Sequence, residues 1–168
     1  MIISILKSYR FITLKTFYCL LFLGFFTANL QAQHAVTSPD GKLIVNLAVN
    51  NGTPTYSVSF KGKLFLEPSP IGLKTNIGDF STGLELKDKQ AQNKIDETYE
   101  LPNIKQSKVH YIANETVFSF SKDKKTVLDI TFRVSNNDVA FKYKVYPQKS
   151  TLAAVIQEEA SGFLFPAG

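Results

Sequence analysis

Residues 128–145 read LDITFRVSNNDVAFKYKV, and this stretch decides the fold class. Residues 128–134 and 139–145 each place an apolar side chain at every second position. Such alternation is typical of half-buried β-strands, because successive side chains point to opposite faces. The polar residues 135–138, Ser-Asn-Asn-Asp, favour a turn between the two runs. The stretch therefore predicts a β-hairpin with one apolar face, formed by Leu128, Ile130, Phe132, Val134, Val139, Phe141, Tyr143 and Val145.

Runs on the N-terminal side of this hairpin repeat the alternation. Their apolar positions are Leu43, Val45, Leu47 and Val49, then Tyr56, Val58 and Phe60, then Phe118 and Phe120. Asn51-Gly52 predicts a tight hairpin between the first two runs, because both residues accept positive φ. Residues 38–41, Ser-Pro-Asp-Gly, predict a turn, and residues 122–125, Lys-Asp-Lys-Lys, predict a solvated hairpin tip.

The whole chain after residue 32 is consistent with an all-β fold. No window longer than about ten residues holds a helical period with capping residues. About nine or ten short strands separated by polar turns predict an antiparallel β-sandwich. Residues 67–72, which contain two prolines, are expected to form a loop that interrupts strand pairing. The polar residues 91–105 are either a long edge strand or an excursion from the sheet.

The first 32 residues have a different composition from the rest. Lys7, Arg10 and Lys15 are basic, no acidic residue occurs, and residues 17–28 are almost purely apolar. An apolar core of about a dozen residues is short for a membrane span, which needs roughly 20. The segment is typical of a signal peptide cleaved near Ala32-Gln33, with an uncleaved anchor as the alternative. We therefore expect residues 1–32 to be a leader and residues 33–168 to be an exported domain, periplasmic or secreted.

The charge and the cysteine of the chain belong largely to this leader. It carries three of the 19 basic residues and none of the 14 acidic residues, so the net charge falls from +5 to +2 without it. The single cysteine, Cys19, also lies in the leader. The remainder is not strongly basic, and we expect neither a nucleic-acid partner nor a membrane partner after cleavage.

Acidic pairs and histidines are the remaining candidates for chemistry. Carboxylates gather in residues 96–100, Asp-Glu-Thr-Tyr-Glu, and at Glu158-Glu159. They suit acid–base catalysis or a hard cation, or they are solvated strand faces, the more common case. His34 and His110 lie far apart in the sequence, so a zinc site is not expected, and His110 is expected to form a local hydrogen bond on a strand. Tryptophan, the strongest sugar-stacking residue, does not occur.

Six strings occur in an order that points to a known family. They are Thr37–Lys42 (TSPDGK), Leu66–Leu73 (LEPSPIGL), Asp96–Tyr99 (DETY), Val109–Glu115 (VHYIANE), Phe132–Phe141 (FRVSNNDVAF) and Glu158–Phe163 (EEASGF). Together they resemble the N-terminal domain of glycoside hydrolase family 97, over nearly all of residues 33–168.

The resemblance implies a fold and a function. Family members are exported enzymes of Bacteroides-like bacteria that remove α-linked glucose or galactose from oligosaccharides. They combine an N-terminal β-super-sandwich, a catalytic (β/α)₈ barrel on which it packs, and a small C-terminal β domain, with calcium in the pocket. The resemblance assigns no catalytic, cofactor-binding or metal-binding residue to this chain, and calcium is implied only for the full-length family. Glu158 and Glu159 match paired glutamates of the family, and no ligand role is carried over to them.

Two readings of the function follow. In the first, residues 33–168 are an incomplete β-super-sandwich that supports the pocket of an α-glucosidase or α-galactosidase, and the chain has no barrel, so it is expected to be inactive alone. In this reading, missing strands are expected to leave unpaired edges and an uncovered apolar face. In the second, the chain is a free-standing carbohydrate-binding or surface-interaction module. The burial expected for most aromatic residues favours the first.

Overall fold

The computed structural model describes residues 34–102, 108–148, 150 and 153–167. The chain divides into the units Met1–Gln31 and Ala32–Gly168, and every described residue belongs to the second. The predicted leader, residues 1–32, lies outside the described residues. Within the described ranges, no helix is long and apolar enough to cross a membrane. These ranges hold twelve strands, more than the nine or ten that alternation indicated, and all their pairings are antiparallel.

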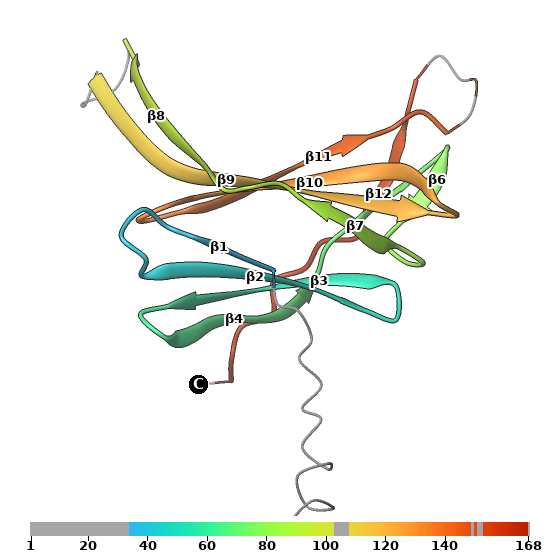
Figure 1. Cartoon of the computed structure of the whole chain (residues 1–168), viewed down its shortest axis with the longest axis horizontal. Coiled ribbons are helices and arrows are strands. Elements are labelled where there is room, and N and C mark those ends of the chain that lie inside the picture. The colour runs from blue at the N-terminus through green and yellow to red at the C-terminus, as the bar shows by residue number, and fades with distance from the viewer. Residues whose placement is uncertain (1–33, 103–107, 149, 151–152, 168) are drawn as a thin grey trace, which may run out of the picture. The chain divides into compact units, whose positions relative to one another are not determined.

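The first sheet has the strand order β1-β2-β3-β4 and forms the lower layer in Figure 1. Its strands are β1 (His34–Thr37), β2 (Leu43–Asn50), β3 (Thr53–Phe60) and β4 (Lys63–Pro70). The predicted hairpin at Asn51-Gly52 is confirmed, with φ of 50° and 78°, and it sets β2 against β3 from Leu43↔Phe60 to Asn50↔Thr53. Both positive angles match the two-residue turn whose twist suits paired strands.

Two expectations for the first sheet were wrong. Phe60 was expected to share the core face with Tyr56 and Val58, but it is 41% exposed, because β3 ends there and the chain turns at Lys61 and Gly62. Residues 67–70 were expected in a loop, but they belong to β4. Strand β4 still pairs with β3 although proline has no backbone N–H to donate. The register shifts between Tyr56 and Val58 and leaves residues 67 and 68 of β4 unmatched, and β4 lies at the end of the sheet order.

The second sheet forms the upper layer in Figure 1, in the order β11-β10-β9-β7, with β8 also paired to β9. Its strands are β7 (Glu85–Lys89), β8 (Asn93–Glu100), β9 (Lys108–Lys122), β10 (Lys125–Ser135) and β11 (Val139–Val145). The predicted hairpin of residues 128–145 is confirmed, with register from Leu128↔Val145 to Val134↔Val139. The predicted tip at residues 122–125 is confirmed too, and Asp123 and Lys124 take positive φ there.

Residues 91–105 were expected to be either a long edge strand or an excursion from the sheet. The structure shows a strand, because residues 93–100 (β8) pair with the first half of β9. This two-stranded arm extends beyond the rest of the second sheet in Figure 1. All side chains of β8 except that of Ile95 are exposed. A two-stranded ribbon without a covered face gains little stability of its own, so the arm depends on the part of β9 that lies in the core.

The third sheet is small and joins the end of the chain to its middle. It consists of β5 (Leu73–Thr75), β6 (Gly78–Phe80) and β12 (Ile156–Glu159), in the order β12-β5-β6. Beyond β12, residues 160–165 continue along β4: the N–H of Gly162 donates to Pro70 at 3.0 Å, and the N–H of Glu67 donates to Leu164 at 2.8 Å. Residues 160–165, which we call the C-terminal segment, therefore add a further chain to the first sheet beyond β4.

The core lies between the first and second sheets. Phe132 is fully buried at its centre, with its ring centroid 5.8 Å from that of Tyr56 and 6.0 Å from that of Phe118. Fully burying a large apolar side chain contributes about 1.5–3 kcal/mol. The predicted apolar faces of β2, β9 and β10 all point into this core, which confirms the antiparallel sandwich.

Candidate functional site

The acidic residues that the sequence singled out lie on exposed strands of different sheets. Asp96 on β8 accepts hydrogen bonds from Lys94 at 3.0 Å and pairs with His110 Nε2 at 2.6 Å. The hydrogen bond with His110 is the main cause that lowers the pKa of Asp96 below its usual value. The local hydrogen bond expected for His110 is thus confirmed. Glu158 lies on β12 and pairs with Lys74 at 2.9 Å.

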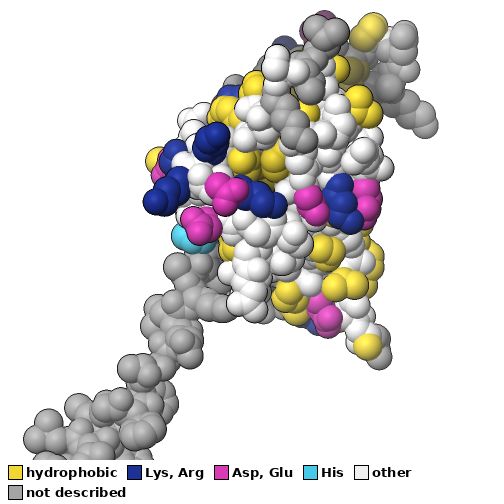
Figure 2. All heavy atoms as spheres, turned by 90° about the vertical axis from the view of Figure 1, so that its right-hand side faces the viewer, with side chains coloured by type: hydrophobic (Ala, Val, Ile, Leu, Met, Phe, Trp, Pro, Cys, Tyr) yellow, Lys and Arg dark blue, Asp and Glu magenta, His cyan; other side chains and the backbone are white. Residues whose placement is uncertain are grey.

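These acidic residues do not gather into a three-residue metal-binding cluster within the described part of the chain. Among the described residues, no three His, Cys, Asp or Glu side chains come together as a metal site would require. Figure 2 shows one face of the molecule, on which basic and acidic side chains lie close together among hydrophobic ones. The side chains of residues 96–100 on β8 and of Glu158 and Glu159 on β12 are exposed, as expected for solvated strand faces.

Two tyrosines hold the C-terminal segment against both sheets. Tyr143 on β11 accepts a hydrogen bond from the Gly72 N–H at 3.0 Å and pairs with the Ser161 hydroxyl. Tyr56 on β3 donates to the Gly162 carbonyl at 3.0 Å. Burial raises the pKa of Tyr143 to about 12 and also raises the pKa of Tyr56. Both hydroxyls therefore stay protonated near neutral pH and act as structural hydrogen-bonding groups.

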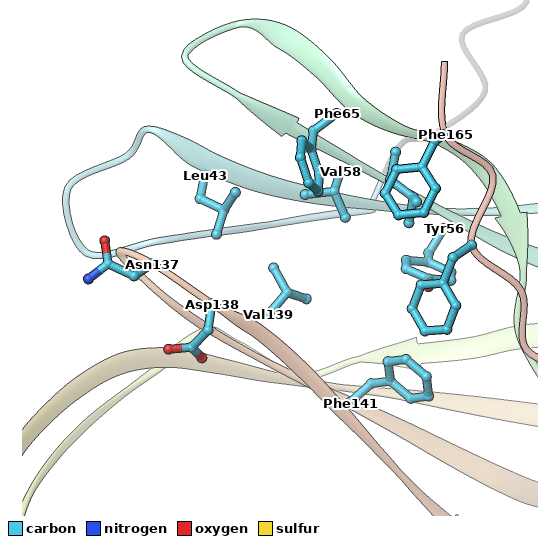
Figure 3. Close-up of a pocket in the computed structure, with 11 residues that line it drawn as sticks. Leu43, Tyr56, Val58, Phe65, Asn137, Asp138, Val139, Phe141 and Phe165 are labelled. Carbon is cyan, nitrogen blue, oxygen red and sulfur yellow. The ribbon is translucent and has the colours of Figure 1, made fainter. Parts of the chain in front are cut away.

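An apolar pocket opens between the two sheets on the side of β4 and β11, and Figure 3 shows its lining. Its volume is about 230 Å³. The first sheet contributes Leu43, Tyr56, Val58, Phe65 and Leu66.

The rest of the lining comes from β11, from the turn before it and from the C-terminal segment, which lies beside β4. It consists of Asn137, Asp138, Val139, Phe141, Phe163 and Phe165. Figure 3 shows Asn137 and Asp138 at one end of the pocket and Phe165 toward the other. Asp138 already accepts hydrogen bonds from the Ser135 and Tyr111 hydroxyls. Asp138 is the one carboxylate among the described residues that line this pocket, whereas most glycoside hydrolases use a pair.

Large apolar side chains stay exposed around the mouth of this pocket. Phe65 is 60% exposed, Phe163 and Phe165 are each 63% exposed, and Leu164 is 51% exposed. The rings of Phe65 and Phe165 meet edge to face with centroids 6.0 Å apart. We call Phe65, Phe163 and Phe165, which line the pocket, the aromatic patch. Exposed apolar residues gathered in this way mark an interaction surface, because scattered single residues are normal but clusters are not.

Sequence reasoning did not identify the aromatic patch. The consecutive apolar residues Phe163, Leu164 and Phe165 were a usable signal, because a single strand face cannot bury all three. Phe65 was missed because residues 67–72, which follow it closely, were interpreted as a loop. Of the tyrosines, Tyr143 packs against the core and Tyr99 is exposed on the arm.

This β-sandwich is similar to known proteins in both sequence and structure. Residues 36–168 match the family described as Glycosyl-hydrolase 97 N-terminal. A probable retaining alpha-galactosidase of Streptomyces bingchenggensis is 32% identical over 140 residues, which cover 83% of this chain and 21% of that protein. The retaining alpha-galactosidase of Bacteroides thetaiotaomicron is 28% identical over 142 residues, which cover 83% of this chain and 20% of that protein.

Solved structures agree with the sequence relatives. The crystal structure of a beta-arabinopyranosidase superimposes with a TM-score of 0.73 at 44% identity, over 79% of this chain and 21% of that one. A family 97 enzyme from Pseudoalteromonas sp. strain K8 in complex with acarbose gives a TM-score of 0.70 at 25% identity, over 79% and 20% of the two chains. The chain thus spans about one fifth of the length of these proteins. It belongs to the glycoside hydrolase family 97 N-terminal family, as the six strings in its sequence implied.

Proposed function

We propose that this chain is the non-catalytic β-sandwich of an exported α-glycoside hydrolase, of α-glucosidase or α-galactosidase type. Its role is to pack on the catalytic (β/α)₈ barrel and to support the pocket that binds an α-linked oligosaccharide. The aromatic patch carries this proposal, because it offers an apolar surface beside a pocket without catalytic carboxylates. Aromatic side chains at the centre of an interface often supply most of its binding energy.

Calcium, implied by the family resemblance, does not fit the described residues on their own. Calcium takes six to eight oxygen ligands, commonly including several carboxylates. The described residues provide no cluster of three acidic or histidine side chains.

Binding to the rest of a family enzyme tests the proposal. The probe is the Bacteroides thetaiotaomicron retaining alpha-galactosidase from which the matched fifth has been removed. We expect the chain to bind it in titration calorimetry, and Phe165→Asp to weaken binding at least about tenfold, because an ionised carboxylate resists burial. The matched control is Tyr99→Asp, an exposed aromatic on the arm, which should leave affinity unchanged.

Activity assays complete the test. The chain alone, incubated with p-nitrophenyl α-glucoside and α-galactoside with and without calcium, should show no turnover above background. Turnover by the chain alone would contradict the non-catalytic role. Failure to bind the probe, together with binding of a maltooligosaccharide in the same calorimeter, would favour a free-standing carbohydrate-binding module instead.

A further inference from the structure

The outer face of the second sheet, which points away from the first sheet, carries a polar hollow. Ile130 and Phe132 of β10 point into the core. Because alternate side chains of a strand point to opposite faces, Thr131 and Arg133 point outward. The arm of β8 and β9 bends toward this outer side in Figure 1. Near its base lies a hollow of about 230 Å³, lined by Glu115, Thr131, Arg133, Ala140, Phe141 and Lys142.

Arg133 is the centre of a cluster on this face, and its Nε donates to Glu115 Oε2 at 2.9 Å. This hydrogen bond is the main cause that raises the pKa of Arg133, and the charges of Glu115 and Glu97 add to it. Tyr111 shares the outer face of β9 with Glu115 and lies opposite Glu97 on β8. The Tyr111 hydroxyl donates to Asp138 at 3.3 Å, so this side chain reaches across β10 toward β11. The base of the arm therefore brings Glu97 and Tyr111 beside the hollow.

Tyr99 adds an exposed aromatic ring to the same face of the arm. It lies two residues after Glu97 on β8, opposite Val109, and it is 43% exposed. Tyr111 is its diagonal neighbour on β9, and diagonal neighbours on paired strands are within reach of each other's aromatic side chains. A tyrosine ring presents a flat apolar face together with a polar hydroxyl. The arm thus supplies a stacking surface next to the polar hollow.

Charges of both signs border the hollow. Glu115 and Arg133 pair with each other, whereas neither Glu97 nor Lys142 has an ion-pair partner within the part of the chain that the structure describes. Glu97 would repel an anion, and Lys142 would repel a cation. A neutral ligand with hydroxyl groups suits both side chains, because a hydroxyl can donate to the carboxylate and accept from the ammonium group.

Asp129 gives this face an unmet hydrogen-bond acceptor. It lies on β10 two residues before Thr131, which lines the hollow, and it is only 6% exposed. Its Oδ2 accepts a hydrogen bond from the Tyr146 hydroxyl at 2.8 Å, whereas its Oδ1 has no partner among the described residues. Leaving a buried acceptor without a donor costs free energy. A ligand hydroxyl held beside Thr131 would supply the missing donor.

We propose that this surface binds a short neutral oligosaccharide, with one pyranose ring in the hollow and a neighbouring ring against Tyr99. The sugar hydroxyls would bond to Glu97 and Lys142, and the apolar face of the outer ring would pack on the tyrosine ring. The hollow is smaller than the roughly 300–1,000 Å³ of drug-sized sites, which suits a single sugar ring. The inference goes beyond the proposed function, because the site lies on the outer face of the second sheet, apart from the aromatic patch.

Residue-resolved NMR titration tests the inference on the unaltered chain. The probes are maltotriose, melibiose and cellotriose, each added separately. We expect at least one of them to shift the amide signals of Glu97, Tyr99, Tyr111, Arg133 and Lys142 saturably, with a Kd on the order of 1 mM. Because the ligand is neutral, raising sodium chloride from about 50 to about 500 mM should change this Kd less than about twofold. No saturable shift with any probe, or shifts confined to other residues, would overturn the inference.

Variants of the exposed aromatic residues locate the stacking surface. Tyr99→Ala removes the ring and should weaken binding of the sugar at least about tenfold, whereas Tyr99→Phe keeps the ring and should stay within about twofold of the parent chain. Phe165→Ala is the matched control, since it removes an equally exposed ring from the aromatic patch, and it should leave the sugar affinity unchanged. Equal affinities of Tyr99→Ala and Phe165→Ala would contradict the placement of the sugar on the arm.

The outcomes distinguish this inference from the proposed function. Loss of sugar binding in Tyr99→Ala, together with loss of binding to the truncated enzyme in Phe165→Asp, supports both, because each variant then affects one surface. A chain that binds the truncated enzyme through Phe165 but binds none of the three sugars overturns the inference and leaves the proposed function standing.

Discussion

The hydroxyl of Tyr143 should be the main polar link between β11 and the C-terminal segment. It accepts the Gly72 N–H at 3.0 Å and pairs with Ser161, and Gly72 itself is buried. Tyr143→Phe removes only this oxygen, so the ring contacts are kept and no large cavity forms. The substitution therefore measures hydrogen bonding rather than packing.

The expected cost follows from the two lost bonds. Leaving the buried Gly72 N–H without an acceptor costs about 1–3 kcal/mol, and the bond with Ser161 contributes about 1 kcal/mol net. Because Tyr143 itself is only half buried, we use the lower half of the first range. Tyr143→Phe should then lower the free energy of unfolding by about 2–3 kcal/mol. For a domain of this size, such a loss lowers the melting temperature by on the order of 10 °C.

Urea denaturation followed by circular dichroism measures this loss. Tyr99→Phe is the matched control, since the Tyr99 hydroxyl lies on the exposed arm, and it should change stability by less than about 0.5 kcal/mol. The amides of Ala160 and Gly162, which donate to Gly72 and Pro70, should also exchange faster in Tyr143→Phe. Equal stability of the two variants, with unchanged exchange of these amides, would refute the role assigned to the Tyr143 hydroxyl.

Three further predictions concern the core, the alkaline limit and one turn. Phe132→Ala should lower the free energy of unfolding by about 3–5 kcal/mol and Phe165→Ala by less than about 1 kcal/mol, and equal losses in urea denaturation would contradict the assignment of Phe165 to the surface. The folded-state pKa of Tyr143, about 12, exceeds the ordinary value of about 10, so the unfolded chain loses its proton first and stability should fall between these two pH values. A pH series of urea midpoints should show this fall, and Tyr143→Phe should reduce its slope. Gly52→Ala should cost about 1–2 kcal/mol, because φ there is +78° and a Cβ would come within 3.0 Å of the Gly83 backbone, and thermal unfolding that matched the parent chain would exclude this strain.

Local signals predicted the strands and tight turns with most success. The alternation of residues 128–134 and the turn at Asn51-Gly52 depend on side-chain direction and on accessible φ, which are properties of a few neighbouring residues. The same reasoning failed for Phe60 and for residues 67–70. Phe60 continues the alternation but lies where its strand ends, and the prolines of β4 are tolerated because the register shifts around them.

The candidate site was less accessible to sequence reasoning than the fold. The acidic pairs attracted attention, yet Asp96 and Glu158 lie on different sheets, where Asp96 pairs with Lys94 and His110, and Glu158 with Lys74. The aromatic patch combines Phe65 with Phe163 and Phe165, which are about a hundred positions away along the chain. Their meeting depends on the pairing of β12 with β5 and of the C-terminal segment with β4, and no local pattern encodes such a pairing.

By itself, the sequence determined that the chain after residue 32 is an antiparallel sandwich and which residues of β2, β9 and β10 face its core. It also determined the family, through six strings kept in order. Only the tertiary structure decided which faces are covered, where the second sheet stops, and that an apolar pocket remains beside β11. The physical reason is that alternation sorts side chains between two faces, whereas burial of a face depends on strands brought to it from distant parts of the chain.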